Sequence, residues 1–351
     1  MSEKVLLKGN EAIAEAAIVA GCKHFYGYPI TPQTEVAAYM SKRLPKIGGT
    51  FLQAESEVAA INMLYGSSAA GVRAMTSSSS PGISLKAEGI SYLAGSDLPA
   101  VIVNIQRAGP GLGGIQPSQA DYYQATKGIG HGDFHIIVIA PSTVQEIVDL
   151  TGTAFDLADI YRMPVMILGD GMLGQMMEPV IFGNLKKRDV PPKTWAAAGT
   201  NGERKRNIIN SLYIEPDQLE KLILERYEKY SVIEEKEVMY EEYLTKDADV
   251  VVVAYGAVAR IARNAIDEAR SLGIKAGLFR PITLWPFPKK QLAELSGNVK
   301  AFVCSEMSMG QMIDDVKLAI ECKKPVLFSG RTGGTVPTPG EILEALKKAC
   351  I

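Results

Sequence analysis

The chain has 351 residues, with 37 Lys or Arg against 39 Asp or Glu and a formal net charge of −2. This near balance gives no reason to expect nucleic acid or an anionic membrane as the main partner. No apolar run approaches the roughly 20 residues of a spanning helix, and the start, "MSEKVLLKGNEA", lacks the apolar core of a secretory signal. We therefore expect a cytoplasmic protein of two domains.

The first half of the chain alternates helical and strand patterns, and its strands are continuous Val/Ile runs. Such runs are typical of parallel strands covered on both faces. Residues 1–190 are therefore predicted to form an α/β domain with a doubly wound parallel sheet. The expected helices are 10–21, a segment after Thr31, 56–71, 83–95 and 144–161, and the expected strands are 23–28, 72–78, 99–106, 135–141 and 164–170.

The character of the sequence changes after residue 190. Residues 191–246 are rich in charge, with a long helical stretch and no strand-like run, and we interpret them as a largely helical connecting segment. Residues 247–351 return to the earlier rhythm and predict a smaller α/β domain, again with a parallel sheet. Its expected strands are 248–256, 275–281, 300–306 and 324–330, and its first helix is 257–273.

Two glycine motifs resemble known cofactor sites but fit them poorly. "GPGLGG", residues 109–114, matches GxGxxG after a strand, yet Pro117 follows where a dinucleotide site would begin its helix. "GDG", residues 169–171, resembles a magnesium-diphosphate motif. That motif requires a pair of Asn residues further along the chain, where this sequence has only the single Asn201. We interpret the second motif as a turn and the first as a loop.

Metal ligands are not grouped in this sequence. The four cysteines, Cys22, Cys304, Cys322 and Cys350, are far apart and include no CxxC, so neither a zinc site nor a self-contained iron-sulfur site is predicted. We expect buried free thiols. The spacing of the cysteines leaves open whether any of them has a redox role.

Several polar groups are candidates for a site, and those near Thr31, after 72–78 and at Arg107 follow predicted strands, where open α/β sheets bind ligands. Glu57, in "AESE", is either an acid favoured at a helix N-terminus or a partly desolvated proton donor. Arg107 either caps carbonyls and pairs with an acid, or holds a carboxylate. Thr31 before Pro32 is predicted to cap a helix. The hydroxyl run "TSSSSPG", residues 76–82, faces the same edge and is either a plain turn or part of a pocket.

Four long motifs show a family resemblance. "GYPITPQTE", "QAESEVAAINMLYGSSAAG", "TSSSSPGISLKAEGISYLAG" and "QRAGPGLGGIQPSQADYYQA" resemble the alpha subunit of 2-oxoacid:ferredoxin oxidoreductases. The resemblance covers nearly the whole chain and implies a thiamine diphosphate pyrimidine-binding-type domain followed by a transketolase C-terminal-like domain. Within the family, "PITPQTEV", "QAESEVAAIN" and "GQMMEPV" look most like the 3-methyl-2-oxobutanoate (2-oxoisovalerate) enzyme, and the 2-oxoglutarate enzyme is the nearest competitor.

The resemblance also implies a chemistry. Thiamine diphosphate would be shared with a beta subunit that holds the diphosphate and Mg, while Glu57, Thr31, Ser79 and Ser80 of this chain contact the cofactor. Glu57 would share a proton with the aminopyrimidine N1', and Arg107 would hold the substrate carboxylate near Thr31. Electrons would pass to iron-sulfur clusters in partner subunits and to ferredoxin, and coenzyme A would take the acyl group. A gamma subunit and a ferredoxin-like delta subunit would complete the assembly.

The loop that follows the strand 99–106 bears on the choice of substrate. The loop 109–119 contains Leu112 and Ile115 and no Lys or Arg, which suits a branched aliphatic 2-oxo acid, although Arg73 or Lys86 could reach the pocket. A hydrophobic pocket separates homologous substrates by only about 1 to 3 kcal/mol. Two other functions stay open: a nucleotide-dependent oxidoreductase that uses "GPGLGG", and a non-catalytic scaffold subunit.

Overall fold

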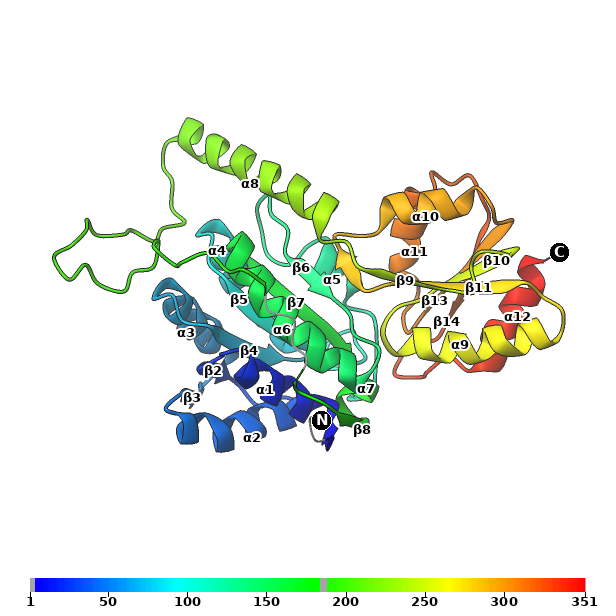
Figure 1. Ribbon diagram of the computed structural model, residues 1–351, viewed down its shortest axis with the longest axis horizontal. Helices are drawn as coiled ribbons and strands as arrows, with labels where there is room; N and C mark the ends of the chain where they lie inside the picture. Colours follow the sequence, from blue (N-terminus) through cyan, green and yellow to red (C-terminus); the bar gives the residue numbers. More distant parts are fainter. Residues whose placement is uncertain (1–3, 184–187, 351) are drawn as a thin grey trace.

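A seven-stranded sheet organises the first part of the computed structural model, which describes residues 4–183 and 188–350 (Figure 1). Its strand order is β12-β6-β7-β5-β4-β2-β3, and all neighbours are parallel except β12, which pairs antiparallel with β6. The strands are β2 (His24–Gly27), β3 (Thr50–Gln53), β4 (Ala74–Ser78), β5 (Ala100–Gln106), β6 (Ile137–Ile139), β7 (Pro164–Asp170) and β12 (Thr283–Trp285).

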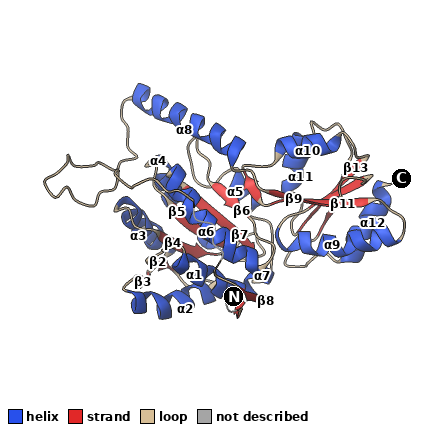
Figure 2. Ribbon diagram, viewed as in Figure 1, coloured by secondary structure: helices blue, strands red, loops and turns tan. Residues whose placement is uncertain are grey.

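Helices cover both faces of this sheet. One layer contains α1, α2 and α6, and the other contains α3 and α4, which pack on each other (Figure 2). Every residue of β4, β5 and β7 is buried, as strands covered on both sides require. The predicted doubly wound α/β fold is confirmed. The helices are α1 (Gly9–Val19), α2 (Thr34–Arg43), α3 (Glu57–Ala69), α4 (Ser80–Gly95), α5 (Tyr122–Thr126), α6 (Val144–Tyr161) and α7 (Gly171–Gln175), with the 3-10 helix η1 (Leu44–Ile47).

A second, five-stranded sheet has the order β14-β13-β10-β11-β9. Its first four strands are parallel and β9 is antiparallel to β11. Helices α9 and α12 pack together on this unit, as do α10 and α11. The elements are β9 (Tyr240–Tyr243), β10 (Val250–Val253), α9 (Gly256–Ser271), β11 (Ala276–Pro281), α10 (Lys289–Ser296), β13 (Ala301–Glu306), α11 (Met312–Ala319), β14 (Val326–Gly330) and α12 (Pro339–Ala349).

The structure adds strands that the sequence did not reveal. The expectation of no strand in residues 191–246 is wrong, because β9 extends the second sheet by pairing with β11. Strand β12 crosses back to complete the first sheet, and β1 (Val5–Lys8) pairs with β8 (Met177–Val180). These strands are four residues or fewer, which gives them little periodic signal. The domain boundaries at 190 and 246 stay predictions.

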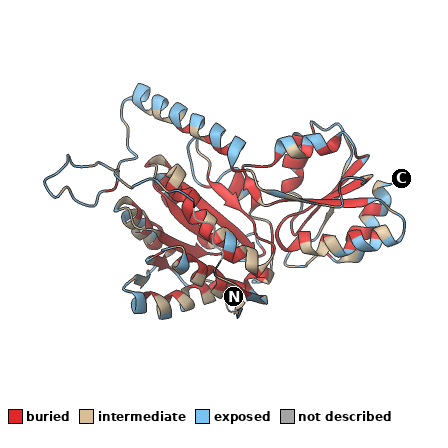
Figure 3. Cartoon of the chain, in the orientation of Figure 1, coloured by how far each residue is buried: buried red, intermediate tan, exposed pale blue. Residues whose placement is uncertain are grey.

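The connecting segment contains one long helix, α8 (Pro216–Lys236), which lies across the top of Figure 1. Described residues 188–215 form neither helix nor strand, and much of this stretch and of α8 is exposed (Figure 3). Among the described helices, none is long and apolar enough to cross a membrane.

The thiols differ from one another in their surroundings. Cys22 and Cys304 are buried, and burial raises the pKa of Cys22 to about 12. Cys322 and Cys350 are exposed, so the expectation of buried thiols is wrong for these two. They lie near the ends of α11 and α12, where the chain leaves the core.

Candidate active site

The candidate residues follow neighbouring strands at the carboxyl edge of the seven-stranded sheet. Thr31 follows β2, Glu57 follows β3, Ser79 and Ser80 follow β4, and Arg107 follows β5. The chain runs from β2 outward to β3 and then returns to place β4 on the other side of β2. Such a reversal of strand order opens a crevice at the carboxyl edge, which is where α/β sheets bind ligands. The predicted convergence on one edge is therefore present.

Arg107 is the buried cation of this edge. It is 6% exposed, and its guanidinium group donates to the carbonyls of Thr31 (3.1 Å) and Leu112 (3.0 Å). Its buried Nε has no hydrogen-bond partner, and within the described ranges no carboxylate forms an ion pair with it. The carbonyl-capping alternative is thus part of its role. Because buried charges normally have a counter-charge, the missing acid points to an anionic ligand.

Thr31 does not cap a helix. Helix α2 begins at Thr34, after Gln33, so the predicted cap at Thr31 is wrong. The reason is a turn: Gln33 N–H bonds to the Ile30 carbonyl (3.1 Å), and the Thr31–Pro32 peptide is cis. The Thr31 carbonyl accepts a hydrogen bond from the buried Arg107 guanidinium group. Thr31 itself is an exposed residue. The backbone, more than the hydroxyl, links this turn to the site in the free chain.

The hydroxyl turn after β4 has two kinds of serine. Ser80 is held tightly: its hydroxyl contacts the Asp121 carboxylate (2.6 Å) and accepts from Arg107 N–H (3.0 Å). Ser78 and Ser79 are completely buried, but their hydroxyl oxygens have no partner. Buried hydroxyls without partners are rare in native structures. Ser80 therefore shapes the edge, while the buried hydroxyls of Ser78 and Ser79 have unused hydrogen-bonding capacity.

Glu57 is the first residue of α3 and is 6% exposed. Ser56 caps the helix through a hydrogen bond from Ala59 N–H (3.1 Å). Gly82 of α4 packs directly against Glu57, since a Cβ at Gly82 would lie 2.7 Å from Glu57 Oε1 and 2.1 Å from Ser78 Oγ. The absence of a side chain at Gly82 lets the carboxylate and the orphaned Ser78 hydroxyl lie together.

Four further polar residues support this edge, and three of them, Gln33, Asn104 and Asp121, were not predicted. Gln33 is fully buried and accepts from Ser77 Oγ (2.5 Å). Asn104, within β5, accepts from Ser80 N–H and donates to Asp121 (2.9 Å). Burial raises the pKa of Asp121, and the bonds from Ser80 and Asn104 oppose this. Lys86 is buried beneath the turn. A polar residue inside an apolar strand, as in "AVIVNIQ", is the signal that could have identified Asn104.

The first glycine motif has the role predicted from its sequence, but the turn predicted for "GDG" is wrong, because these residues end β7 and begin α7 directly. "GPGLGG" lies in a loop, and the next helix after β5, α5, begins only at Tyr122, as expected for a motif that is not a dinucleotide site. Asp170 of "GDG" caps the short helix α7 by accepting from Met172 and Leu173 N–H (2.9 and 3.0 Å). Burial raises the pKa of Asp170 to about 6.

The cations that could have reached the pocket differ in position. Arg73 precedes β4, at the amino edge of the sheet, and pairs with Asp156 (2.6 Å) and Asp159 (2.7 Å). It therefore lies away from the carboxyl edge. Lys86 lies on that edge but is fully buried and donates to Thr76 Oγ1 (2.8 Å) and the Ser77 carbonyl (3.1 Å). Neither Arg73 nor Lys86 is therefore a free cation at the surface.

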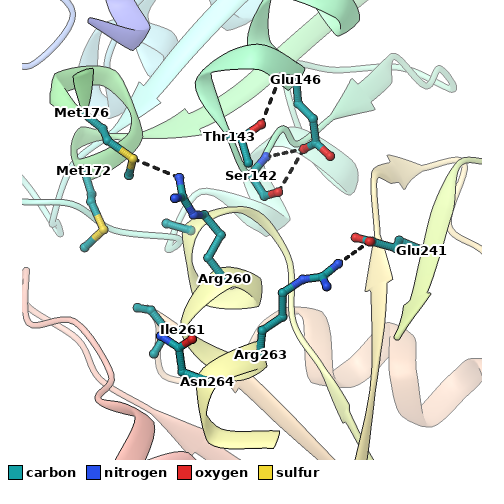
Figure 4. Close-up of a pocket in the computed structure, with 11 residues that line it drawn as sticks. Ser142, Thr143, Glu146, Met172, Met176, Glu241, Arg260, Ile261, Arg263 and Asn264 are labelled. Carbon is teal, nitrogen blue, oxygen red and sulfur yellow. Dashed lines mark hydrogen bonds and ion pairs between the residues drawn. The ribbon is translucent and has the colours of Figure 1, made fainter. Parts of the chain in front are cut away.

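A cavity of about 550 Å³ lies elsewhere, between α6, α7 and α9 (Figure 4). None of Thr31, Glu57, Ser79, Ser80 or Arg107 lines it. Its charged side chains are already paired across the space: Arg260 with Glu178, Arg263 with Glu241, and Glu146 with Arg280. The charges of this cavity are therefore paired, whereas Arg107 at the sheet edge has a buried Nε without a partner.

Comparisons with known proteins give matches over most of the chain. Residues 15–246 match the family "Pyruvate flavodoxin/ferredoxin oxidoreductase, thiamine diP-bdg", and residues 248–342 match "Pyruvate:ferredoxin oxidoreductase core domain II". The ketoisovalerate oxidoreductase subunit VorB of Methanothermobacter marburgensis is 50% identical over 98% of this chain and 97% of its own length. The 2-oxoglutarate synthase subunit KorA of Methanothermobacter thermautotrophicus is 36% identical, with 99% of each chain covered.

A solved structure shows the same architecture. The 2-oxoglutarate:ferredoxin oxidoreductase from Magnetococcus marinus, with 2-oxoglutarate, coenzyme A and succinyl-CoA bound, superimposes with a TM-score of 0.89 at 27% identity. The match covers all of this chain and 66% of that chain, so the solved chain contains a further third. The arrangement of both α/β units is thus shared with a protein that acts on a 2-oxo acid.

Proposed function

Since this chain belongs to the 2-oxoacid:ferredoxin oxidoreductase family, we propose that it is the alpha subunit of an enzyme that oxidatively decarboxylates 2-oxoisovalerate. The products are an acyl-CoA and CO₂, and ferredoxin is reduced. The observation that supports this most strongly is Arg107, a buried guanidinium group with an unpartnered Nε and no described acid beside it. A 2-oxo acid supplies the carboxylate that this guanidinium group lacks.

The same edge fits thiamine diphosphate. Ser78 and Ser79 present buried hydroxyls without partners, and Glu57 places a buried carboxylate beside them. When bound, thiamine diphosphate supplies the nucleophilic carbon and the electron sink that decarboxylation of a 2-oxo acid requires. Glu57 would hold a proton against a ring nitrogen of the aminopyrimidine, and Thr31, Ser79 and Ser80 would shape its pocket.

Arg107 would also orient the substrate carboxylate. Its two carbonyl contacts fix the guanidinium plane, so that its remaining N–H groups are oriented before substrate arrives. The carboxylate must lose its charge as CO₂ leaves, so binding must orient it without over-stabilising the ground state. Two donors already occupied by Thr31 and Leu112 limit how many bonds Arg107 can give to the substrate.

Partner subunits would complete the reaction. We propose that a beta subunit holds the diphosphate and Mg, and that iron-sulfur clusters lie in partner subunits, with gamma and ferredoxin-like delta subunits in the assembly. Scattered cysteines, two of them buried, support this division of labour. The exposed Leu112 and Ile115 support it too, because these apolar side chains stand beside the site, 82% and 57% exposed in the free chain.

Sequence identity supports a branched-chain substrate. This chain is 50% identical to the ketoisovalerate oxidoreductase subunit and 36% identical to the 2-oxoglutarate synthase subunit, each over almost the whole chain. The loop with Leu112 and Ile115 adds no cation for a second carboxylate. The competing substrate is 2-oxoglutarate, favoured by the fold match to an enzyme that binds it.

Reconstitution with its partner subunits tests both levels. We expect the highest kcat/KM with 2-oxoisovalerate, and lower values with pyruvate and 2-oxoglutarate; a preference for 2-oxoglutarate would overturn the substrate. Glu57→Gln should abolish reduction of ferredoxin while the assembly persists. If Glu57→Gln stayed active, the proposed role of Glu57 in the active site would be refuted. The alternative of a non-catalytic scaffold subunit would be supported only if the wild-type assembly had no activity.

Arg107→Leu tests the carboxylate site. Removing one partner of a buried charge pair costs about 2 to 5 kcal/mol, so kcat/KM should fall about 30- to 5,000-fold. Arg73→Leu is the matched control, because Arg73 is also a mostly buried arginine of this sheet but lies at the other edge. It should lower stability and leave kcat/KM of the folded protein unchanged. Equal effects of both variants on kcat/KM would remove Arg107 from the substrate site.

A further inference from the structure

Gln119 is a fully buried residue that joins the two α/β units, and the reaction described above gives it no role. Its side-chain amide donates to the Tyr255 carbonyl (2.9 Å) and accepts from Met307 N–H (3.0 Å). Its backbone bonds to the same two residues, because its N–H donates to the Met307 carbonyl (2.9 Å) and its carbonyl accepts from the Tyr255 hydroxyl (3.2 Å). Both the side chain and the backbone of Gln119 are therefore bonded to the second unit.

The partners of Gln119 lie at the carboxyl edge of the second sheet. Tyr255 follows β10 and Met307 follows β13, and these two strands are parallel neighbours. Gly256 packs against the same amide, since an added Cβ would lie 3.1 Å from Gln119 Nε2. Two neighbouring strand ends thus fix the position of Gln119.

The loop before Gln119 belongs to the Arg107 site. Residues 108–118 leave β5 at Arg107 and return to it, because Arg107 forms an isolated β-bridge with Pro117, two residues before Gln119. The Leu112 carbonyl in this loop accepts from the guanidinium group (3.0 Å). A shift of the loop would therefore move two groups that hold Arg107.

The residues after Gln119 bond to both units. Gln311 of the second unit donates to the Ala120 carbonyl (2.8 Å) and accepts from Tyr123 N–H (2.8 Å). On the other side, Asp121 N–H donates to Gln106 Oε1 of β5 (3.1 Å). This segment thus lies between the carboxyl edges of the two sheets, and Gln119 attaches the end of it that is next to the Arg107 loop.

We propose that Gln119 is a positioning residue for Arg107, through which the second α/β unit holds the loop 108–118 in the geometry that binds a 2-oxo acid carboxylate. The proposal rests on the proposed function, in which Arg107 receives that carboxylate. A buried amide with both its donor and its acceptor bonded holds one geometry, because a shift would leave buried polar groups unpaired. A misplacement of about 1 Å at such a site can cost about 10²-fold in rate. The second unit thereby contributes to substrate binding through the loop.

The direct test uses the full chain without cofactor or substrate. Gln119→Met keeps the length of the side chain and removes both of its hydrogen bonds. Hydrogen exchange measured by mass spectrometry should show the amides of residues 107–119 exchanging about 10- to 100-fold faster than in the wild type. Peptides from α6 should exchange at the wild-type rate, which shows that the first unit stays folded.

Arg260→Met is the matched control. Arg260 of α9 pairs with Glu178 of β8 (2.8 Å), so this substitution also breaks a contact between the two units, but the contact includes no residue of the loop. It should leave the exchange of residues 107–119 and kcat/KM unchanged. Equal effects of Arg260→Met and Gln119→Met on the exchange of residues 107–119 would overturn the proposal.

The reconstituted enzyme connects the loop to the substrate. Gln119→Met should lower kcat/KM for 2-oxoisovalerate about 10- to 100-fold and leave KM for coenzyme A unchanged. In the Arg107→Leu background, the same substitution should change kcat/KM by no more than about twofold, because its effect passes through Arg107. An equal loss in both backgrounds would overturn the proposal and leave Gln119 a residue that only joins the units.

Tyr255→Phe is a milder variant for the case in which Gln119→Met does not fold. It removes the hydroxyl bond to the Gln119 carbonyl and keeps both bonds of the amide. Exchange of residues 107–119 should then be about 2- to 10-fold faster, with a loss of kcat/KM of similar size. Unchanged exchange, or faster exchange with an unchanged kcat/KM, would overturn the proposal. An inactive wild-type assembly would instead refute the proposed function, while the exchange rates would still decide whether Gln119 holds the loop.

Discussion

Replacing Gly82 with alanine adds one methyl group where α4 meets Glu57. The new Cβ would lie 2.1 Å from Ser78 Oγ and 2.7 Å from Glu57 Oε1, against an ordinary contact of about 3.5 Å. Overpacking of this kind costs about 1 to 3 kcal/mol, and the better helix propensity of alanine returns about 1 kcal/mol. The net change should be a loss of about 0 to 2 kcal/mol in the free energy of unfolding.

The effect on activity should exceed the effect on stability. To relieve the contact, the Glu57 carboxylate or the Ser78 hydroxyl must move by more than half an ångström, and a misplacement of about 1 Å can cost about 10²-fold in rate. We therefore expect kcat of the reconstituted enzyme to fall 10- to 100-fold in Gly82→Ala, measured as reduction of ferredoxin, while denaturant unfolding reports the small loss of stability.

Gly66→Ala is the matched control, because Gly66 is an exposed helical glycine of α3 with no atom within 4 Å of an added Cβ. It should raise the free energy of unfolding by up to about 1 kcal/mol and leave kcat unchanged. If Gly82→Ala behaved like Gly66→Ala in both measurements, the close packing of α4 on Glu57 would be refuted, and with it the placement of Glu57 in the site.

Three further outcomes can be measured by denaturant unfolding. Ser56→Ala should lower the free energy of unfolding by about 1 kcal/mol, because it removes the N-cap of α3; no change would mean that the cap is dispensable. Tyr122→Phe should cost about 1 to 2 kcal/mol, since its buried hydroxyl donates to Asp315 across the two α/β units; a neutral result would show that this contact is not maintained. Burial alone would raise the pKa of Glu146, but the hydrogen bonds from Arg280 lower it below its usual 4.5. Its stabilising effect is thus present above pH 4.5 and lost as the pH falls through the lower folded value, so Glu146→Gln should reduce stability at pH 7 and flatten its acid dependence, and an unchanged acid slope would contradict this.

Local sequence determined most of the secondary structure, because the signals are strong over short distances. The apolar run of β5 and the 3.6-residue pattern of α6 place both elements almost to the residue. The strand-end positions of Arg107 and Ser80 followed from the same pattern. The polar-loop edge could therefore be predicted before any contact was known, since the carboxyl ends of parallel strands meet at one edge.

Tertiary structure decided what those residues do. Thr31 and Pro32 have the sequence of a helix start, yet long-range bonds from Asn10 to the Pro32 carbonyl and from Arg107 to the Thr31 carbonyl hold a turn there. Lys86 is one of many lysines in the sequence, and only the packing of α3 on α4 shows that it is buried. The family motifs supplied the identity of the site residues. Three buried polar atoms have no hydrogen-bond partner, namely Arg107 Nε and the hydroxyl oxygens of Ser78 and Ser79, and they become buried only when separate strands converge. Such burial depends on contacts between residues far apart in the chain, which no local pattern records.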